Sequence, residues 1–496
     1  MNALAAWSSS RFDGGLKTVR SSFQSAGIYI FLISFACVYY VSNALLLLGH
    51  YDLGWHLAAG DLIRDRGSVP FQDPWSFTLA DQQWYNLSWL WDVMASVLFQ
   101  YTGFSGLVLS VALSGALIVG YLVSACLRSG ASAIAVCLSV FAACLLYPSF
   151  ATPPNIYLAA APNTATMLFC VIFYAECLKR TRWYLLPAMM ALWANLHGGF
   201  LLGFLIIGVF GAVALLKRDW ENVRIYGLAG TGCLIAVFIN PLGWHIYDGV
   251  VSTLGHFVQT NITEWMSYWA NMSMPGSIPG ILYILIFIVL ELFYRGSSPI
   301  PLETRLLSWL FLPLGLYQFR YMSFFFIFST VPLALHLDRL LPGRLNDFEV
   351  KKSLLAAGII GACALPLTFM RIEPALGLPE MISEQDAHYL QTHFSHARLL
   401  NHWNVGGLLI FRTHGAVPVF VDGRAATAYP DDLLRDYFKL VEWNVDEAAW
   451  DAVLAKYRID TVLWVKAHDG LRQFLVNKRG WKEQYAGTYE SVYVKP

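Results

Sequence analysis

The sequence is poor in charge. Asp, Glu, Lys and Arg make up only 13% of its 496 residues, whereas 57% are hydrophobic, which is far from the composition of an ordinary soluble domain. Acidic and basic residues are equal in number, at 33 each, so the chain has no basic surplus and nucleic-acid binding gains no support. The scarcity of charge, together with long apolar runs, indicates a protein that spans a membrane several times.

Cysteine is missing from the polar parts of the chain. The eight cysteines lie within or at the ends of apolar stretches, at positions 37, 126, 137, 144, 170, 177, 233 and 363. This placement argues against a disulfide framework or a cysteine metal cluster and favours small core side chains. The N-terminus also lacks a short apolar region followed by a small-residue cleavage site, so we expect the first long apolar run to be a retained anchor.

Eleven apolar windows are long enough, or nearly long enough, to cross a bilayer. They cover residues 27–49, 106–127, 131–149, 161–178, 183–196, 199–216, 225–240, 278–294, 305–318, 321–338 and 353–370. The windows 183–196 and 305–318 are short, and each could be half of a hairpin that does not fully cross. We predict an α-helical polytopic membrane domain over residues 1–370, with about 11 transmembrane helices.

A twelfth candidate, residues 84–100, would reverse the orientation of every later span. Its polar residues recur at every fourth position and form one stripe on a helix, opposite an apolar face. The stripe consists of Ser88, Asp92, Ser96 and Gln100. We predict that this helix lies along the interface within a first outer loop, residues 50–105, with its stripe towards water.

The distribution of basic residues supports this orientation. With eleven spans and the N-terminus inside, every short inside loop contains Lys or Arg, as the positive-inside rule requires. The first outer loop, a second outer loop at residues 241–277 and the tail after Met370 then lie outside.

The tail, residues 371–496, changes character. Short β-like runs at 417–423, 460–465 and 490–496 alternate with helical patterns at 430–442, 446–457 and 470–478. Such alternation predicts a small α/β domain on the outer side of the membrane.

Four parts of the chain resemble the GT-C superfamily of integral-membrane glycosyltransferases, in a bacterial branch close to protein mannosyltransferases, aminoarabinose transferases and Rgt-type lipopolysaccharide-core transferases. They are "YDLGWHLAAGDLIRDRGSVPFQDPWSF" with "WYNLSWLWDV", then "LWANLHGGFLLG", then "INPLGWHIYDG" continuing to "TEWMSYW", and in the tail "NHWNVGGLLIF" with "PVFVDGRAATAYPDDLLRDY". The resemblance implies transfer of a monosaccharide from a polyprenyl-phosphate donor to a periplasmic acceptor, which would be a glycolipid, a polysaccharide or a protein. It also implies a site on the periplasmic side of a bacterial inner membrane, in contact with membrane lipid.

In this superfamily the first outer loop carries the acidic residue of the active site, and Asp52 matches that position. A carboxylate at the interface, partly desolvated by Trp55 and neighbouring aromatic residues, suits a general base that accepts the proton of the acceptor hydroxyl. The alternative is that Asp52 caps the helix 53–65. His56 shares a helical face with Asp52 and could orient it or contact the phosphate, or be a ring lodged in the interface.

Four further residues are candidates for substrate binding. Asp73 precedes a proline, which favours a turn role over a substrate contact. His197, next to two glycines, either contacts phosphate or sugar or is hydrogen-bonded within the bundle. Arg320 lies in an apolar and aromatic stretch, where it either binds the lipid-linked phosphate or snorkels to the interface. Glu264 has aromatic neighbours that could stack on a sugar ring, which suggests a second carboxylate in the site. The alternative is that Glu264 is a solvated acid in a loop.

No cofactor is expected, and a divalent metal is not favoured. Oligosaccharyltransferases hold such an ion through an acidic pair in the loop after the third span, and residues 149–163 here contain no acid. The "VDGR" stretch is interpreted as the end of a strand followed by a turn, with a local ion pair between Asp422 and Arg424. The tail as a whole could bind the acceptor or act as a lid.

Two other classes of function stay open, a transporter or flippase of lipid-linked saccharides and a non-catalytic membrane scaffold. Ion-coupled transporters usually need ionisable groups near the middle of their spans. The windows have none there, since Glu176 and Glu291 lie near the inner ends. A scaffold gives no reason for polar groups to converge at one outer face.

Overall fold

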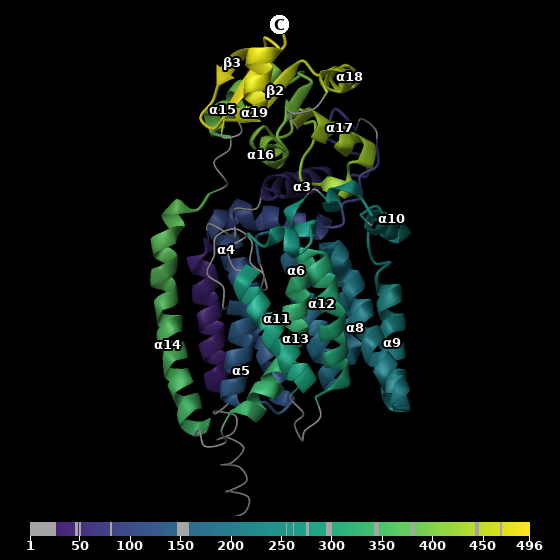
Figure 1. The fold of residues 1–496 in the computed structure, drawn as a ribbon, viewed down its shortest axis with the longest axis vertical. Coiled ribbons are helices and arrows are strands. Elements are labelled where there is room, and N and C mark those ends of the chain that lie inside the picture. The colour runs from purple at the N-terminus through teal and green to yellow at the C-terminus, as the bar shows by residue number, and fades with distance from the viewer. Residues whose placement is uncertain are drawn as a thin grey trace, which may run out of the picture.

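The computed structural model describes residues 26–44, 48, 51–79, 82–145, 158–253, 255–260, 262–273, 277–293, 300–341, 347–377, 382–441, 446–466 and 469–496. The chain is mostly helical. Its helices form one elongated bundle, and a small domain with a four-stranded sheet lies beyond one end of that bundle (Figure 1).

The helices of the bundle coincide with the predicted apolar windows. They are Ala26–Ser42, α4 Trp89–Arg128, α5 Ala133–Val140 followed by the π-helix Phe141–Leu145, α6 Asn163–Lys179, α7 Leu186–Leu196, α8 Leu201–Leu216, α9 Trp220–Ala236, α11 Ser277–Phe293, α12 Leu302–Tyr317, α13 Met322–Leu340 and α14 Asp347–Ile372. Within the described ranges, four helical segments are long and apolar enough to cross a membrane: Trp89–Arg128, Gly198–Leu216, Phe319–Leu340 and Val350–Ala375. The chain is thus a multi-pass membrane protein, while the count of eleven spans stays a prediction.

α4 changes direction at Gly103, between the predicted interfacial helix and the predicted span. Gly103 has φ 60° and ψ −153°, a conformation that glycine adopts without the steric cost of a Cβ atom. The part of α4 before Gly103 packs on α3 (Leu53–Arg66), which lies across the end of the bundle (Figure 1). Gly103 thus separates a helical part within the predicted helix 84–100 from the predicted span 106–127.

The polar stripe before Gly103 faces α3 and not water, so its predicted direction is wrong. Ser88, Asp92 and Ser96 are buried, and only Gln100 is exposed. Ser96 Oγ donates to Asp61 Oδ1 at 2.6 Å and accepts from Arg64 Nη1 at 2.9 Å. Gly60 packs directly against the Asp92 carbonyl group, where a Cβ atom would not fit. The stripe is an interhelical contact because α3 supplies polar partners of its own.

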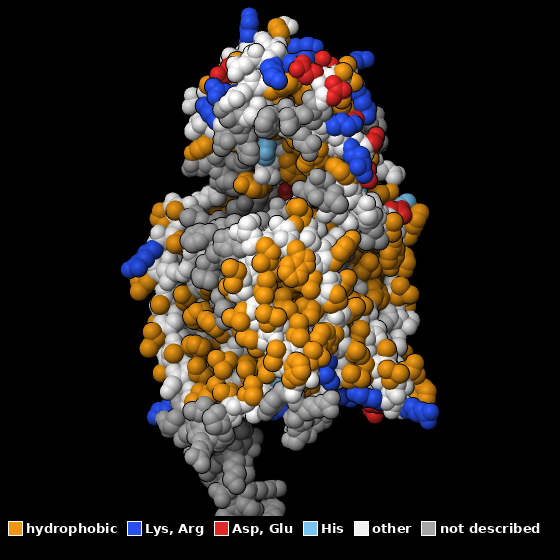
Figure 2. Space-filling model, viewed as in Figure 1, with side chains coloured by type: hydrophobic (Ala, Val, Ile, Leu, Met, Phe, Trp, Pro, Cys, Tyr) orange, Lys and Arg blue, Asp and Glu red, His pale blue; other side chains and the backbone are white. Residues whose placement is uncertain are grey.

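The flank of the bundle is covered by hydrophobic side chains, and Lys and Arg gather at the end away from the small domain (Figure 2). This is the surface expected of a bundle inside a bilayer. α14 lies at the edge of the bundle and leads towards the small domain (Figure 1). It packs on the first helix, since a Cβ atom on Gly358 would lie 2.5 Å from the Phe31 nitrogen.

The C-terminal domain contains a mixed sheet in the order β1-β2-β4-β3. Its strands are β1 Leu399–Asn401, β2 Thr461–Val465, β3 Lys482–Ala486 and β4 Glu490–Val494; its helices are α15 Glu384–Phe394, α16 Trp403–Arg412, α17 Asp431–Val441, α18 Glu447–Tyr457 and α19 Asp469–Gln473. β1 is parallel to β2, and the other two pairs are antiparallel. The β-like runs at 460–465 and 490–496 form β2 and β4. The helical patterns at 430–442 and 446–457 form α17 and α18, and the pattern at 470–478 forms α19 and the π-helix Phe474–Lys478 that follows it.

The β-like run at 417–423 does not join this sheet, which corrects the prediction. Instead, Val419 N donates to the Trp75 carbonyl at 3.0 Å, and Phe77 N donates to the Val419 carbonyl at 3.2 Å. Thr78 Oγ1 also donates to the Phe420 carbonyl at 2.9 Å. An apolar run in the tail therefore pairs with the first outer loop, and backbone hydrogen bonds join the two domains.

Candidate functional site

α3 lies between the bundle and the C-terminal domain (Figure 1). α16 crosses it with very little space between the backbones. A Cβ atom on Gly54 would lie 2.6 Å from the Gly407 carbonyl oxygen, and a Cβ atom on Gly407 would lie 3.0 Å from Trp55 Cδ1. These glycines let the C-terminal domain reach the first turn of α3, where Asp52 begins the helix.

Asp52 is half-buried and lies directly against the C-terminal domain. It occupies the N-cap position of α3, but its side chain makes no capping hydrogen bond, so the capping alternative is wrong. A Cβ atom on Gly423 would overlap Asp52 Oδ1 and lie 2.5 Å from its Cγ. The carboxylate is therefore enclosed on one side by the loop 422–424.

His56 is buried and is held by Asp92. Its Nδ1 lies 2.6 Å from Asp92 Oδ1, and Asn86 Nδ2 donates to the other carboxylate oxygen at 2.7 Å. The imidazole stacks on Trp55, with ring centroids 3.5 Å apart, and meets the edge of Trp91 at 5.0 Å. From the sequence, Asp92 is predicted only as a member of the polar stripe, and its contact with His56 is not predicted. The signal in the sequence that could have identified Asp92 is that it is the only carboxylate of that stripe.

Asp73 lies in a turn, in which Trp75 N donates to its Oδ1 at 3.0 Å. The same oxygen forms an ion pair with Arg424 Nη1 at 2.6 Å, and both side chains are buried. The structure therefore gives the Asp73 carboxylate a partner in the C-terminal domain rather than an open position.

Arg424 is the centre of a buried polar cluster that joins the two domains. Its Nε and Nη2 bond both oxygens of Asp422, at 2.9 and 2.7 Å. Nη2 also donates to Ser76 Oγ at 2.9 Å and to Tyr429 Oη at 3.1 Å. Burial alone would lower the pKa of Arg424, but Asp422, Tyr429 and Asp73 raise it well above its usual value, so Arg424 stays a cation. The predicted pair with Asp422 is present, as part of a larger network.

His197 is hydrogen-bonded to its surroundings through one ring nitrogen. Nδ1 accepts from Gly199 N at 3.0 Å and lies 2.7 Å from Thr166 Oγ1, which itself accepts from Trp193 Nε1 at 2.9 Å. Burial, together with the positive charge of nearby Arg320, lowers the pKa of His197 to about 3. The ring is thus neutral at pH 7, and this network assigns its proton to Nε2.

Arg320 and Glu264 are neighbours, although 56 positions separate them in the printed sequence. Arg320 Nη1 lies 4.0 Å from Glu264 Oε1, and the guanidinium lies 3.9 Å from the centroid of the Trp265 ring. The Glu264 side chain is 50% exposed and that of Arg320 is 26% exposed. The Arg320 charge also acts on His197, so these predicted binding residues occupy one region.

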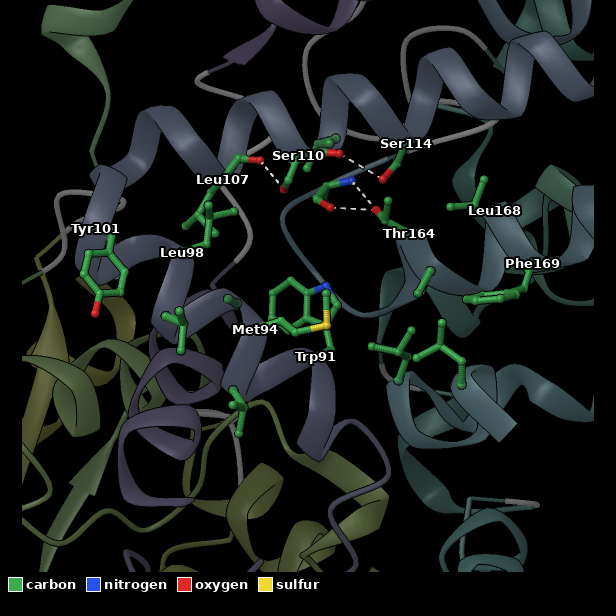
Figure 3. Close-up of a pocket in the computed structure, with 18 residues that line it drawn as sticks. Trp91, Met94, Leu98, Tyr101, Leu107, Ser110, Ser114, Thr164, Leu168 and Phe169 are labelled. Carbon is green, nitrogen blue, oxygen red and sulfur yellow. Dashed lines mark hydrogen bonds between the residues drawn. The ribbon is translucent and has the colours of Figure 1, made fainter. Parts of the chain in front are cut away.

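An apolar groove of about 640 Å³ runs between α4, α6 and α7 (Figure 3). Its serine and threonine hydroxyl groups donate to backbone carbonyls and so add little polarity: Ser110 to Leu107 at 2.7 Å, Ser114 to Ser110 at 2.9 Å and Thr164 to Ala159 at 2.6 Å. Several of the lining residues, among them Met94, Val97, Tyr101 and Leu192, are exposed. The groove therefore opens on the apolar flank of the bundle.

The groove reaches the polar residues described above. Trp91 lines it and touches His56, while Leu196 lines it and precedes His197 in the chain. A long apolar molecule in this groove would place its end near the two histidines.

Neither a family model nor a curated protein matches the sequence, but solved structures match the fold. An oligosaccharyltransferase of Archaeoglobus fulgidus in the apo form has a TM-score of 0.55 and 10% identity, over 94% of this chain and 74% of that chain. The oligosaccharyltransferase AglB of the same organism, in complex with an inhibitory peptide and a dolichol-phosphate, has a TM-score of 0.54 and 10% identity over the same shares. ArnT of Cupriavidus metallidurans in the apo state has a TM-score of 0.51 and 15% identity, over 94% of this chain and 97% of that chain.

AglB and ArnT are both members of the GT-C superfamily. This chain has the GT-C fold. The resemblance that the sequence motifs indicated is thereby confirmed at the level of the fold.

In this GT-C fold, the described residues include no group of three or more His, Cys, Asp or Glu side chains placed to hold a metal ion. Most of the acid-free loop 149–163 lies outside the described residues. Independence from a metal stays a prediction.

Proposed function

We propose that this protein is a membrane glycosyltransferase that moves a monosaccharide from a polyprenyl-phosphate donor to an acceptor on the periplasmic side of a bacterial inner membrane. The acceptor would be a glycolipid, a polysaccharide or a protein. The observation that carries the proposal is the apolar groove of a GT-C fold, which leads to His56 and His197. The charge of Arg320 acts on His197, and Asp52 lies one helical turn before His56 on α3.

The groove suits the polyprenyl chain of the donor. Lipid tails are as apolar as the groove lining, so the groove selects a chain by shape and packing rather than by a hydrophobic gain. Among the similar structures, that of AglB contains a dolichol-phosphate, which has the same chemical character. A prenyl chain lying against Trp91 and Leu196 would place its phosphate beside His197.

Arg320 and His197 would bind that phosphate. A guanidinium presents paired donors to phosphate oxygens, and the neutral His197 ring offers Nε2–H as a further donor. Arg320 would exchange its 4.0 Å contact with Glu264 for the phosphate. Glu264 and Trp265 would then face the sugar, whose ring can pack on the indole.

Asp52 would act as the general base. It accepts the proton of the acceptor hydroxyl while that oxygen attacks the anomeric carbon. The bond between the anomeric carbon and the phosphate oxygen breaks, and polyprenyl phosphate leaves with the electron pair, stabilised by Arg320. A single displacement inverts the anomeric configuration. His56, held in place by its contact with Asp92, would orient Asp52 or contact the phosphate. The proposed reaction uses neither a metal nor a cofactor.

The test is Asp52→Asn in a strain that lacks the native protein, with mass spectrometry of the envelope glycans. We expect the glycan made by the wild type to be absent, while the variant is present in the membrane in normal amount. Asp65→Asn is the matched control, because Asp65 is exposed on the same helix, and it should retain full product. A wild-type glycan profile in the Asp52→Asn strain would reject Asp52 as the base.

A further inference from the structure

The C-terminal domain contacts the membrane domain at Asp52, the residue that accepts the proton in the proposed reaction. Gly423 is the point of contact. No strained backbone conformation explains a glycine there, because Gly423 is not among the glycines of positive φ. What a larger residue would meet at this position is the Asp52 carboxylate.

The loop that carries Gly423 is fixed from both sides. Behind it, Gly406 of α16 packs against the loop, since a Cβ atom there would lie 2.8 Å from Asp422 Cβ. Asn401 Nδ2 donates to the Val421 carbonyl at 2.7 Å, and Phe420 N donates to Asn401 Oδ1 at 2.8 Å. The tail residues 420–422 therefore have little freedom to retreat from α3.

Arg424 ties the same loop to the first outer loop. Its guanidinium bridges Asp422 and Asp73, at 2.7 and 2.6 Å, and all three side chains are almost completely buried. It also lies over the rings of Trp75 and Trp84, 5.0 and 4.9 Å from their centroids. A buried ion pair of this kind holds a geometry strongly, because separating it leaves a charge without a partner in a medium of low polarity.

We propose that the C-terminal domain completes the catalytic site: Gly423 positions the Asp52 carboxylate, and the Arg424–Asp73 ion pair holds Gly423 against it. This inference rests on the proposed role of Asp52 as the base. Gly423 limits the directions in which the carboxylate can turn and keeps water from one side of it. The C-terminal domain thus acts as one wall of the site, and Gly423 and Arg424 are positioning residues.

The main test is Gly423→Ala, with Gly377→Ala as the matched control. An added Cβ atom at Gly377 would meet no atom within 4 Å. In the strain that lacks the native protein, we expect Gly423→Ala to reduce the glycan product at least tenfold and Gly377→Ala to leave it unchanged. The binding constant of purified protein in nanodiscs for undecaprenyl phosphate should be the same for both variants, because the groups proposed to bind the phosphate, Arg320 and His197, belong to the bundle and not to this loop.

The outcomes distinguish the two proposals. A wild-type glycan level in Gly423→Ala, together with loss of product in Asp52→Asn, would overturn the positioning role and leave the proposed function standing. Full product in Asp52→Asn would overturn the proposed base itself. Weaker binding of undecaprenyl phosphate by Gly423→Ala would also overturn the positioning role, since the loop would then act on the donor site.

A second measurement covers the case in which Gly423→Ala fails to fold. Asp52→Cys is labelled with a water-soluble maleimide, and peptide mass spectrometry gives the labelling rate at position 52. Adding Asp73→Ala removes the ion pair across the domains but leaves Arg424 paired with Asp422 and bonded to Ser76. We expect labelling at least tenfold faster with Asp73→Ala. Equal rates would overturn the claim that the ion pair holds the loop against α3.

Discussion

Arg424→Met should destabilise the folded protein by about 3–5 kcal/mol, the cost of breaking a buried ion pair by removal of one partner. Methionine has nearly the length of arginine but no charge and no N–H group. It would leave two carboxylates, those of Asp73 and Asp422, buried without a cation, where their side chains are only 1% and 0% exposed. Ser76 and Tyr429 would each lose a donor as well.

The matched control is Arg435→Met. Arg435 is 55% exposed and lies 3.9 Å from the Asp431 carboxylate, so solvent screens the pair and its loss should cost less than about 1 kcal/mol. Urea unfolding of the purified protein in detergent, followed by tryptophan fluorescence, measures the difference, and Trp75 and Trp84 lie directly on the guanidinium. Equal unfolding midpoints for the two variants would refute the role given to the buried cluster.

Two further predictions concern the C-terminal domain and the groove. Burial, with the nearby charge of Asp386, raises the pKa of Glu490 to about 8 from 4.5. The folded protein therefore favours the protonated carboxyl group. The contribution of this group to the free energy of unfolding is complete below pH 4.5 and is lost as the pH rises through 8. Thermal unfolding should show wild-type stability falling by up to about 1.4 kcal/mol per pH unit in this window, and Glu490→Gln, which cannot ionise, should remove the slope; parallel profiles would contradict this. Leu168→Trp narrows the groove and should weaken binding of undecaprenyl phosphate in nanodiscs at least threefold. The control Leu109→Trp, at an exposed position on α4, should leave the affinity unchanged. Equal affinities for the two variants would show that the groove does not hold the prenyl chain.

The sequence predicts the parts of this fold that depend on local patterns. Apolar windows mark the helices of the bundle because a spanning helix needs a long apolar surface. The change from a polar stripe to an apolar run predicts two helices, 84–100 and 106–127, and the structure separates them at Gly103. β2 and β4 correspond to predicted short β-like runs, which contain several valines.

Contacts between distant segments could not be read from the sequence. Asp73 and Arg424 are 351 positions apart, and His56 and Asp92 are 36 apart, so no spacing rule links them. The run at 417–423 is rich in valine, as strands often are, but its composition does not say which backbone will pair with it. Likewise the stripe on α4 identifies a polar face, and only the position of α3 shows what covers that face.

The placement of α14 has a consequence for how related chains will differ. A 26-residue helix is about 39 Å long, which exceeds the hydrocarbon thickness of roughly 30 Å, and most of its surface, including Ile359, Ile360, Leu367 and Met370, faces outward. We expect acyl chains of the bilayer to cover this surface, and acyl chains accept any apolar residue. Related chains should therefore preserve the length and hydrophobicity of this helix, while its individual residues are free to change to other apolar residues.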